Sequence, residues 1–125
     1  MRLRNLSMSL SRLDVSEQLE VSLEQYVTPG ELASRWLFDI QSFGDLPIGC
    51  RVADLGAGNG ILGIGAAMMG AGFVKLVEAD PKLCKLANAN AESMLMTGKY
   101  EVCNQVIGEH NLQSVSYTHL RAHET

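Results

Sequence analysis

The sequence contains few of the residues that mark secreted or membrane-spanning proteins. Its three cysteines, Cys50, Cys84 and Cys103, are widely spaced and form no CxxC pair, so they predict free thiols in a reducing, cytoplasmic compartment. The longest uncharged apolar stretch, residues 60–74, has 15 residues, whereas a helix that crosses a bilayer needs about 18. We therefore expect neither a disulfide framework nor a membrane span.

Positive charge is also scarce. Lys and Arg number 10 against 14 Asp and Glu, which gives a net charge of −4. Such a chain does not bind nucleic acid through its overall charge, so any contact with RNA must come from a local patch. The 125 residues, 46% of them hydrophobic, are enough for one domain and too few for two.

The last segment, residues 115–125, differs in kind from the rest of the chain. Its string VSYTHLRAHET resembles one reading frame of a transposase adapter used to prepare DNA for sequencing, so we expect an artefactual tail outside the fold. The tail holds His119 and His123, which leaves His110 as the one histidine upstream. Since no cysteine or carboxylate is spaced to join His110 around an ion, we expect no metal site.

The first half of the chain predicts two helices. Apolar residues at steps of three and four predict an amphipathic first helix, with arginines on or beside its polar side. The second helix is predicted to start at Thr28, Pro29 and Glu31, acting as cap, first helical residue and capping-box partner, and to end at Gly44. The expected apolar positions are Leu3, Leu6, Leu10 and Leu13 in the first helix and Leu32, Trp36, Leu37 and Ile40 in the second.

From residue 51 onward, strands and helices alternate. Apolar segments at 52–55, 73–77 and 102–107 predict strands, and the segments at 61–69 and from Asp80 onward predict helices. This alternation predicts an α/β fold, a Rossmann-like doubly wound parallel sheet truncated after its third strand and preceded by the two helices. Because the first strand is central in the doubly wound order, we expect truncation to leave 52–55 as an exposed apolar edge.

A glycine loop connects the first strand to the following helix. Its spacing is Asp54-x-Gly56-x-Gly58-x-Gly60, and it also fits the dinucleotide fingerprint Gly58-x-Gly60-x-x-Gly63. Loops of this kind lie at the carboxyl edge of the sheet, where open α/β sheets bind ligands. The fingerprint alone does not separate NAD from S-adenosylmethionine.

The acid at the end of the first strand favours S-adenosylmethionine. A carboxylate of Asp54 beside a pyrophosphate would cost roughly 4 kcal/mol per charge pair at about 4 Å and an effective dielectric constant near 20. S-adenosylmethionine carries a sulfonium and an ammonium instead of phosphates. Glu78 has two oxygens that can accept ribose hydroxyls, and Glu109, at the end of the third predicted strand, could accept from an adenine amino group. The alternative is that Asp54 and Glu78 only cap helix starts.

Two motifs carry a family resemblance. Residues 52–62, VADLGAGNGIL, resemble the first motif of class I S-adenosylmethionine-dependent methyltransferases. Residues 24–29, EQYVTP, resemble the segment that packs over the methionine end of the cofactor in N6-adenine methyltransferases. With the first helix, they occur in the same order in the archaeal and eukaryotic family that methylates one adenosine of small-subunit ribosomal RNA, and the resemblance covers residues 1–114.

The resemblance implies a division of the chain and roles for individual residues. Residues 1–28 would hold a helix and a cofactor-covering segment, 29–114 a partial methyltransferase domain, and 115–125 the tail. Tyr26 would pack beside the cofactor, although a core aromatic is an equal alternative. Gln25 and Thr28 would border the aminoacyl end of the cofactor, Gly56, Asn59 and Ile61 would line the loop, Glu78 would hold the ribose, and Glu109 with His110 would face the adenine.

The implied activity is methyl transfer to the N6 of an adenosine in ribosomal RNA, with the base swung out of its stack. The family's catalytic Asn-Pro-Pro-aromatic motif is not found, since the sequence has no Pro-Pro pair, so no catalytic residue is assigned and the chain itself is expected to be inactive. RNA and a small activator protein are the implied partners. Arg2, Arg4 and Arg12 are candidate phosphate contacts, or alternatively a solvated helix face.

Three functions therefore remain open. The resemblance favours an RNA adenine-N6 methyltransferase. A protein-glutamine or DNA-adenine methyltransferase would share the same glycine loop, and an NAD-binding oxidoreductase domain would share the fingerprint.

Overall fold

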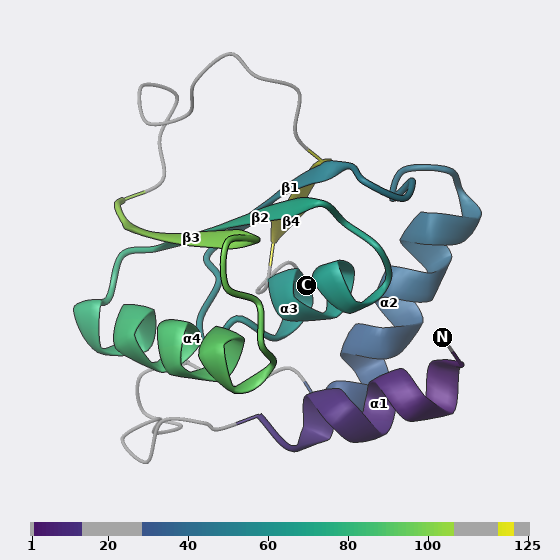
Figure 1. Ribbon diagram of the computed structural model, residues 1–125, viewed down its shortest axis with the longest axis horizontal. Helices are drawn as coiled ribbons and strands as arrows, with labels where there is room; N and C mark the ends of the chain where they lie inside the picture. The colour runs from purple at the N-terminus through teal and green to yellow at the C-terminus, as the bar shows by residue number, and fades with distance from the viewer. Residues whose placement is uncertain (1, 14–28, 107–117, 122–125) are drawn as a thin grey trace.

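The computed structural model describes residues 2–13, 29–106 and 118–121. The helices and strands in these ranges are shown in Figure 1. The longest helices have 13 residues, and within the same ranges no helix is both long and apolar enough to cross a membrane. In chain order the elements are α1 Leu3–Ser11, α2 Gly30–Ser42, β1 Arg51–Leu55, α3 Ile61–Met68, β2 Phe73–Glu78, α4 Pro81–Ser93, β3 Tyr100–Asn104 and β4 Thr118–Arg121.

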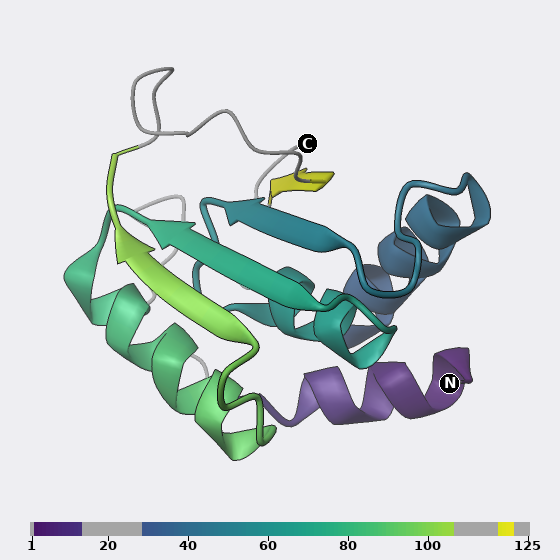
Figure 2. The ribbon, with the colours of Figure 1, turned by 45° about the horizontal axis from the view of Figure 1, so that its top comes forward.

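The strands form one parallel sheet in the order β3-β2-β1-β4. All four run in the same direction, so the carboxyl ends of β1, β2 and β3 meet at one edge (Figure 2). Helices α3 and α4 cover one face of the sheet, and α1 and α2 pack against α3 (Figures 1 and 2). The predicted Rossmann-like α/β fold is confirmed, and its ligand-binding edge is formed by the loops that follow β1 and β2.

The sheet does not end at β1. Val52–Leu55 pair with Thr118–Arg121, which lie on the opposite side of β1 from β2. The expectation that β1 forms an exposed edge is therefore wrong, and a part of the tail expected to lie outside the fold contributes backbone to the sheet. The reason is that strand pairing uses main-chain groups, so a free sheet edge can accept an extended segment of any origin. The origin of residues 115–125 as a translated adapter stays a prediction.

The leucine pattern of α1 is confirmed. Leu6, Leu10 and Leu13 are buried between α1 and its neighbours. The crossing of α1 and α2 is close because α2 begins with a glycine, Gly30. A Cβ atom on residue 30 would lie 2.7 Å from the backbone nitrogen of Ser11 and 2.8 Å from a backbone oxygen of α1. Helix α1 therefore shares one core with the α/β sheet and does not form a separate unit.

Helix α2 differs from its predicted start and face. Pro29 is the N-cap residue in an extended conformation, so the helix begins one residue later than predicted, and no side chain caps it. The buried positions of α2 include Ala33 and Leu37, whereas Leu32 is 38% exposed. The prediction erred because it chose the largest apolar residues, while the close crossing with α1 selects small ones. The predicted end is confirmed, since Gly44 adopts a φ of +84° directly after the last turn.

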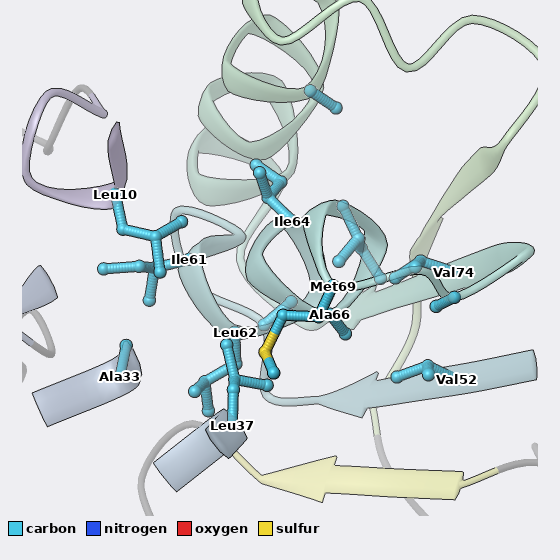
Figure 3. Packing of buried hydrophobic residues seen from close by; sticks show 14 of the residues in the cluster. Leu10, Ala33, Leu37, Val52, Ile61, Leu62, Ile64, Ala66, Met69 and Val74 are labelled. Atoms are coloured by element: carbon cyan, nitrogen blue, oxygen red, sulfur yellow. The ribbon is translucent and has the colours of Figure 1, made fainter. Parts of the chain in front are cut away.

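The main hydrophobic core lies between the sheet and the helices (Figure 3). Every second residue of β1 and β2 faces it, as parallel strands covered by helices require. A smaller cluster lies on the other face of the same strands. The residues labelled in Figure 3 are Leu10, Ala33, Leu37, Val52, Ile61, Leu62, Ile64, Ala66, Met69 and Val74; the smaller cluster is Ala53, Leu55 and Val77 with Cys103 packed against it.

Strand β3 begins and ends earlier than predicted. The sequence analysis placed it at 102–107, but the observed strand runs from Tyr100 to Asn104. Gly98 turns the chain with a φ of +80°, and Tyr100 pairs at once with Val74 of β2. The strand therefore starts two residues after the turn.

The close crossing at Gly30 predicts a large effect of a small substitution. We expect Gly30→Ala to destabilise the folded chain by about 1–3 kcal/mol, because the added methyl group meets backbone atoms of α1 that cannot move aside. Thermal or urea unfolding measures this change. Glu31→Ala, at the exposed next position, is the matched control and should change stability by less than about 0.5 kcal/mol. An unchanged midpoint for Gly30→Ala would contradict the close crossing.

Candidate functional site

The site is built where β1 turns into α3. Residues 56–60 reverse the chain between them, and three of their glycines, Gly56, Gly58 and Gly60, have positive φ angles of +75°, +57° and +88°. Only glycine adopts this conformation without strain, so the glycine spacing has a direct conformational cause. The turn places the amino end of α3 at the carboxyl edge of the sheet.

Helix α3 begins without a capping side chain of its own. Its N-cap is Gly60, and the backbone N–H groups of the first turn have no partners within the helix. The carboxylate of Asp54 takes the place of the cap: its Oδ2 accepts a hydrogen bond of 3.0 Å from the N–H of Gly63. The side chain of Asn59 adds a weaker bond of 3.3 Å to the N–H of Ile61.

The burial of Asp54 changes the argument that its charge selects the cofactor. The side chain is completely buried, and no donor in the described part of the chain reaches its Oδ1 atom. Burial raises the pKa of Asp54 to about 7, the bond from Gly63 opposes this, and the nearby charge of Glu78 adds to it. Near neutral pH this group is therefore only partly ionised, and it points at the helix rather than into solvent. The alternative that Asp54 caps a helix start describes what the structure shows of this residue.

The backbone N–H groups of the loop already have acceptors. Gly56 and Ala57 both donate to the carbonyl oxygen of Val77 at 2.9 Å, and Gly60 donates to Ala57 at 2.9 Å. The N–H of Gly58 donates to Glu78 at 2.9 Å. A pyrophosphate bound in a loop of this kind needs such donors for itself. The geometry therefore disfavours a dinucleotide here through the use of these donors, rather than through the charge of Asp54.

Glu78, at the end of β2, ties the loop to the next helix. Its Oε1 accepts from Gly58 and its Oε2 accepts from the N–H of Asp80 at 2.8 Å, and the side chain is 8% exposed. A carboxylate has about four lone-pair positions, of which these bonds use two. The remaining positions suit the hydroxyls of a ribose, so the predicted role of Glu78 fits its geometry and stays a prediction.

The outer side of the loop has room for a ligand. A Cβ atom on Gly58 would have no heavy atom within 4 Å, and both Gly56 and Gly58 are half-buried. By contrast, a Cβ atom on Gly60 would lie 3.5 Å from Ala87 of α4. The loop is thus packed on its inner side and open at Gly58. A small adenosine-containing cofactor fits this arrangement, with Glu78 and the backbone at Gly56 and Gly58 as the groups that would hold it.

The third strand does not supply an acid at the edge. It ends at Asn104, whose side chain donates to the carbonyl oxygens of Glu78 and Ala79 at 3.1 and 2.9 Å. The placement of Glu109 at the strand end is therefore wrong, because the strand stops five residues earlier. Glu109 and His110 lie outside the described residues.

Two other expected site residues, Gln25 and Thr28, also lie outside the described ranges, so their predicted contacts with the cofactor stay predictions. The structure brings together Asp54, Gly56, Gly58, Asn59, Ile61 and Glu78. The sequence analysis missed two asparagines that hold this edge, Asn90 and Asn104. Polar residues at otherwise apolar helix or strand positions were the signal that could have found them.

The comparisons with known proteins agree with this geometry. Residues 37–116 match the family described as ribosomal protein L11 methyltransferase (PrmA). The chain belongs to this family of class I S-adenosylmethionine-dependent methyltransferases. The predicted family class and cofactor class are thereby confirmed, and the match includes β1, the glycine loop and β2.

Several relatives show where the likeness extends. The rRNA N(6)-adenosine-methyltransferase METTL5 of Danio rerio is 35% identical over 92 residues, which is 74% of this chain and 44% of the relative. A candidate RNA methyltransferase from Pyrococcus horikoshii superposes with a TM-score of 0.73 at 40% identity, over 82% of this chain and 50% of that one. Magnesium protoporphyrin IX methyltransferase from Synechocystis PCC 6803, solved with S-adenosylhomocysteine bound, gives a TM-score of 0.52 at 25% identity, over 61% and 36% of the two chains. The chain thus spans about half the length or less of these proteins.

The buried carboxyl group predicts a specific dependence of stability on pH. The pKa of Asp54 is raised from 3.8 to about 7 in the folded chain, so between these values the folded state binds a proton that the unfolded state has lost. Its contribution to stability is therefore complete below about pH 4 and is lost as the pH rises to 7. Asn at this position does not titrate.

We therefore expect the melting temperature of Asp54→Asn, relative to the unchanged chain, to rise by about 5 °C or more between pH 5 and pH 8. Differential scanning calorimetry at the two pH values measures the difference. Asp45→Asn, an exposed position in the loop before β1, is the control and should show a small change. A difference that is the same at both pH values would show that Asp54 titrates normally.

Proposed function

We propose that this chain is the cofactor-binding part of an S-adenosylmethionine-dependent methyltransferase that acts on the N6 atom of an adenosine in ribosomal RNA. The observation that carries the proposal is the glycine loop, whose donors are used internally while Glu78 and the open side at Gly58 face a ligand. The likeness to an rRNA N(6)-adenosine-methyltransferase over 74% of the chain supports the choice of substrate. The three free thiols are compatible with the reducing, cytoplasmic compartment predicted from the sequence.

The residues of this chain would bind and orient rather than react. S-adenosylmethionine supplies a methyl group on a positively charged sulfur, which an adenine amino group can attack in line. Glu78 would accept the ribose hydroxyls, and the backbone at Gly56 and Gly58 would allow the cofactor to approach closely. Because the sequence has no Pro-Pro pair, the Asn-Pro-Pro-aromatic motif of adenine-N6 enzymes is not present in these 125 residues. We therefore expect cofactor binding without methyl transfer from this chain alone.

Methylation of a protein is the second candidate function. It is favoured by the match of residues 37–116 to the ribosomal protein L11 methyltransferase family. The glycine loop serves both functions equally, because it contacts the cofactor and not the substrate. A DNA-adenine substrate shares the chemistry of the first proposal. An NAD-binding oxidoreductase is disfavoured by the loop donors that Val77 and Glu78 already occupy.

Calorimetric titration tests the cofactor. We expect saturable heat with S-adenosylhomocysteine and none with NAD at the same concentration. Glu78→Gln should weaken binding of S-adenosylhomocysteine about tenfold, because one acceptor oxygen is replaced by a donor that faces the N–H of Asp80. Glu92→Gln, an exposed change of the same type on α4, should bind like the unchanged chain. Binding of NAD alone would overturn the proposal.

The RNA partner is tested at α1. Arg2, Arg4 and Arg12 are exposed, residues 2–13 contain no acid, and among the described residues no carboxylate lies within ion-pair distance of these arginines. This gives a local basic surface on a chain of net charge −4. If the three side chains contact phosphates, replacing all three with Ala should weaken binding to a ribosomal RNA fragment and reduce the salt slope by about 2.

The matched control replaces three exposed cations elsewhere, Arg35, Lys85 and Lys99, with Ala. Both triple variants change the net charge equally, so a difference between them reports the position of the charges. Equal RNA affinities and salt slopes for the two variants would remove α1 as the phosphate-binding surface. Fluorescence anisotropy at several salt concentrations measures both quantities.

A further inference from the structure

Helix α4 packs directly behind the glycine loop. A Cβ atom on Gly60 would lie 3.5 Å from the Cβ and 3.6 Å from the Cα atom of Ala87, so the loop backbone rests against this helix. One turn further along α4, Asn90 lies on the same buried face. Its side chain is 2% exposed, although its buried neighbours on that face are apolar or small. A buried amide at such a position needs hydrogen-bond partners to offset the loss of water.

The partner of Asn90 is the backbone of the loop. Its Nδ2 donates a hydrogen bond of 2.9 Å to the carbonyl oxygen of Asn59, 31 residues earlier in the sequence. Asn59 itself is 7% exposed. If α3 extended one residue further towards the amino end, this carbonyl would point along the helix, but the positive φ of Gly60 turns the chain away. The amide of Asn90 meets the carbonyl in the direction that this turn gives it.

The bond from Asn90 adjoins the bond from Glu78. Glu78 accepts from the N–H of Gly58, and Asn90 donates to the carbonyl of the next residue, Asn59. Two consecutive residues of the loop are therefore held by side chains from two different elements, the end of β2 and the middle of α4. The orientation of the peptide planes at Gly58, where the loop is open to a ligand, depends on both.

We propose that Asn90 is a positioning residue for the cofactor-binding loop: its bond to the Asn59 carbonyl holds the loop in the shape that receives S-adenosylmethionine. The proposal rests on the proposed function for the identity of the ligand, but not for the bond itself. Asn90 does not contact the ligand site directly. It acts through the backbone of Asn59 and fixes a conformation that two flexible glycines would otherwise leave free.

The test replaces the donor and keeps the volume. Asn90→Leu removes the amide from a buried position, and Asn90→Ser provides a second variant whose hydroxyl is too short to bridge the same distance. Asn88→Leu is the matched control, because Asn88 lies on the same helix but bonds to Tyr100 and Glu92, away from the loop. Thermal unfolding identifies the variants that fold, and if Asn90→Leu does not, Asn90→Ser is measured in its place.

Two readouts separate positioning from general stability. Amide hydrogen exchange without ligand should become about tenfold faster at residues 56–60 in the Asn90 variants, while amides in the middle of β1 and β2 keep their rates. The affinity for S-adenosylhomocysteine, measured by calorimetry, should fall about tenfold, which corresponds to 1.4 kcal/mol. Asn88→Leu should leave both the loop exchange and the affinity unchanged.

Each outcome decides a different question. Loop amides that exchange at the unchanged rate in both Asn90 variants, or that speed up only together with all other amides, would overturn the positioning role. A chain that binds S-adenosylhomocysteine no better than NAD would overturn the proposed function, while the exchange rates of residues 56–60 would still decide whether Asn90 holds the loop. Faster loop exchange together with weaker binding supports both proposals.

Discussion

The site depends on one constraint: α3 starts from a glycine loop that has no side chain to cap it. The sharp turn requires glycines, and glycines bring neither donors nor acceptors beyond their own backbone. The N–H of Gly63 must therefore find an acceptor from another element, and Asp54 supplies it from the end of β1. The loop that faces the ligand is held in shape by side chains that come from β1, β2 and α4.

This constraint explains why acids gather at the carboxyl edge of the sheet. Asp54 accepts from the helix start, and Glu78 accepts from the loop and from the beginning of α4. Favourable placement of carboxylates near helix amino ends has the same electrostatic basis. Only Glu78 keeps lone pairs in a position that suits a ribose, while Asp54 is enclosed. Structural and ligand-binding roles are thus divided between two residues that look alike in the sequence.

The half of the sheet seen here is sufficient to present a cofactor but not to choose a substrate. The family match and the RNA methyltransferase relatives share the glycine loop, and they differ in what they methylate. β1 lies in the middle of the sheet, between β2 and β4, so the loop after β1 is at its centre. The pairing of Thr118–Arg121 with β1 shows how strongly this central strand favours a neighbour on each side.

The sequence by itself determined the order of the elements, the parallel sheet, the buried leucines of α1 and the position of the glycine loop, because these follow from local periodicity and from the conformational needs of glycine. It could not determine which face of α2 is buried, since the small residues there are selected by contact with Gly30 and α1. Nor could it show that Asp54 is enclosed, that β1 is paired on both sides, or that Asn90 reaches the carbonyl of Asn59. These facts depend on residues far apart in the chain, whose contacts exist only after the helices have packed on the sheet.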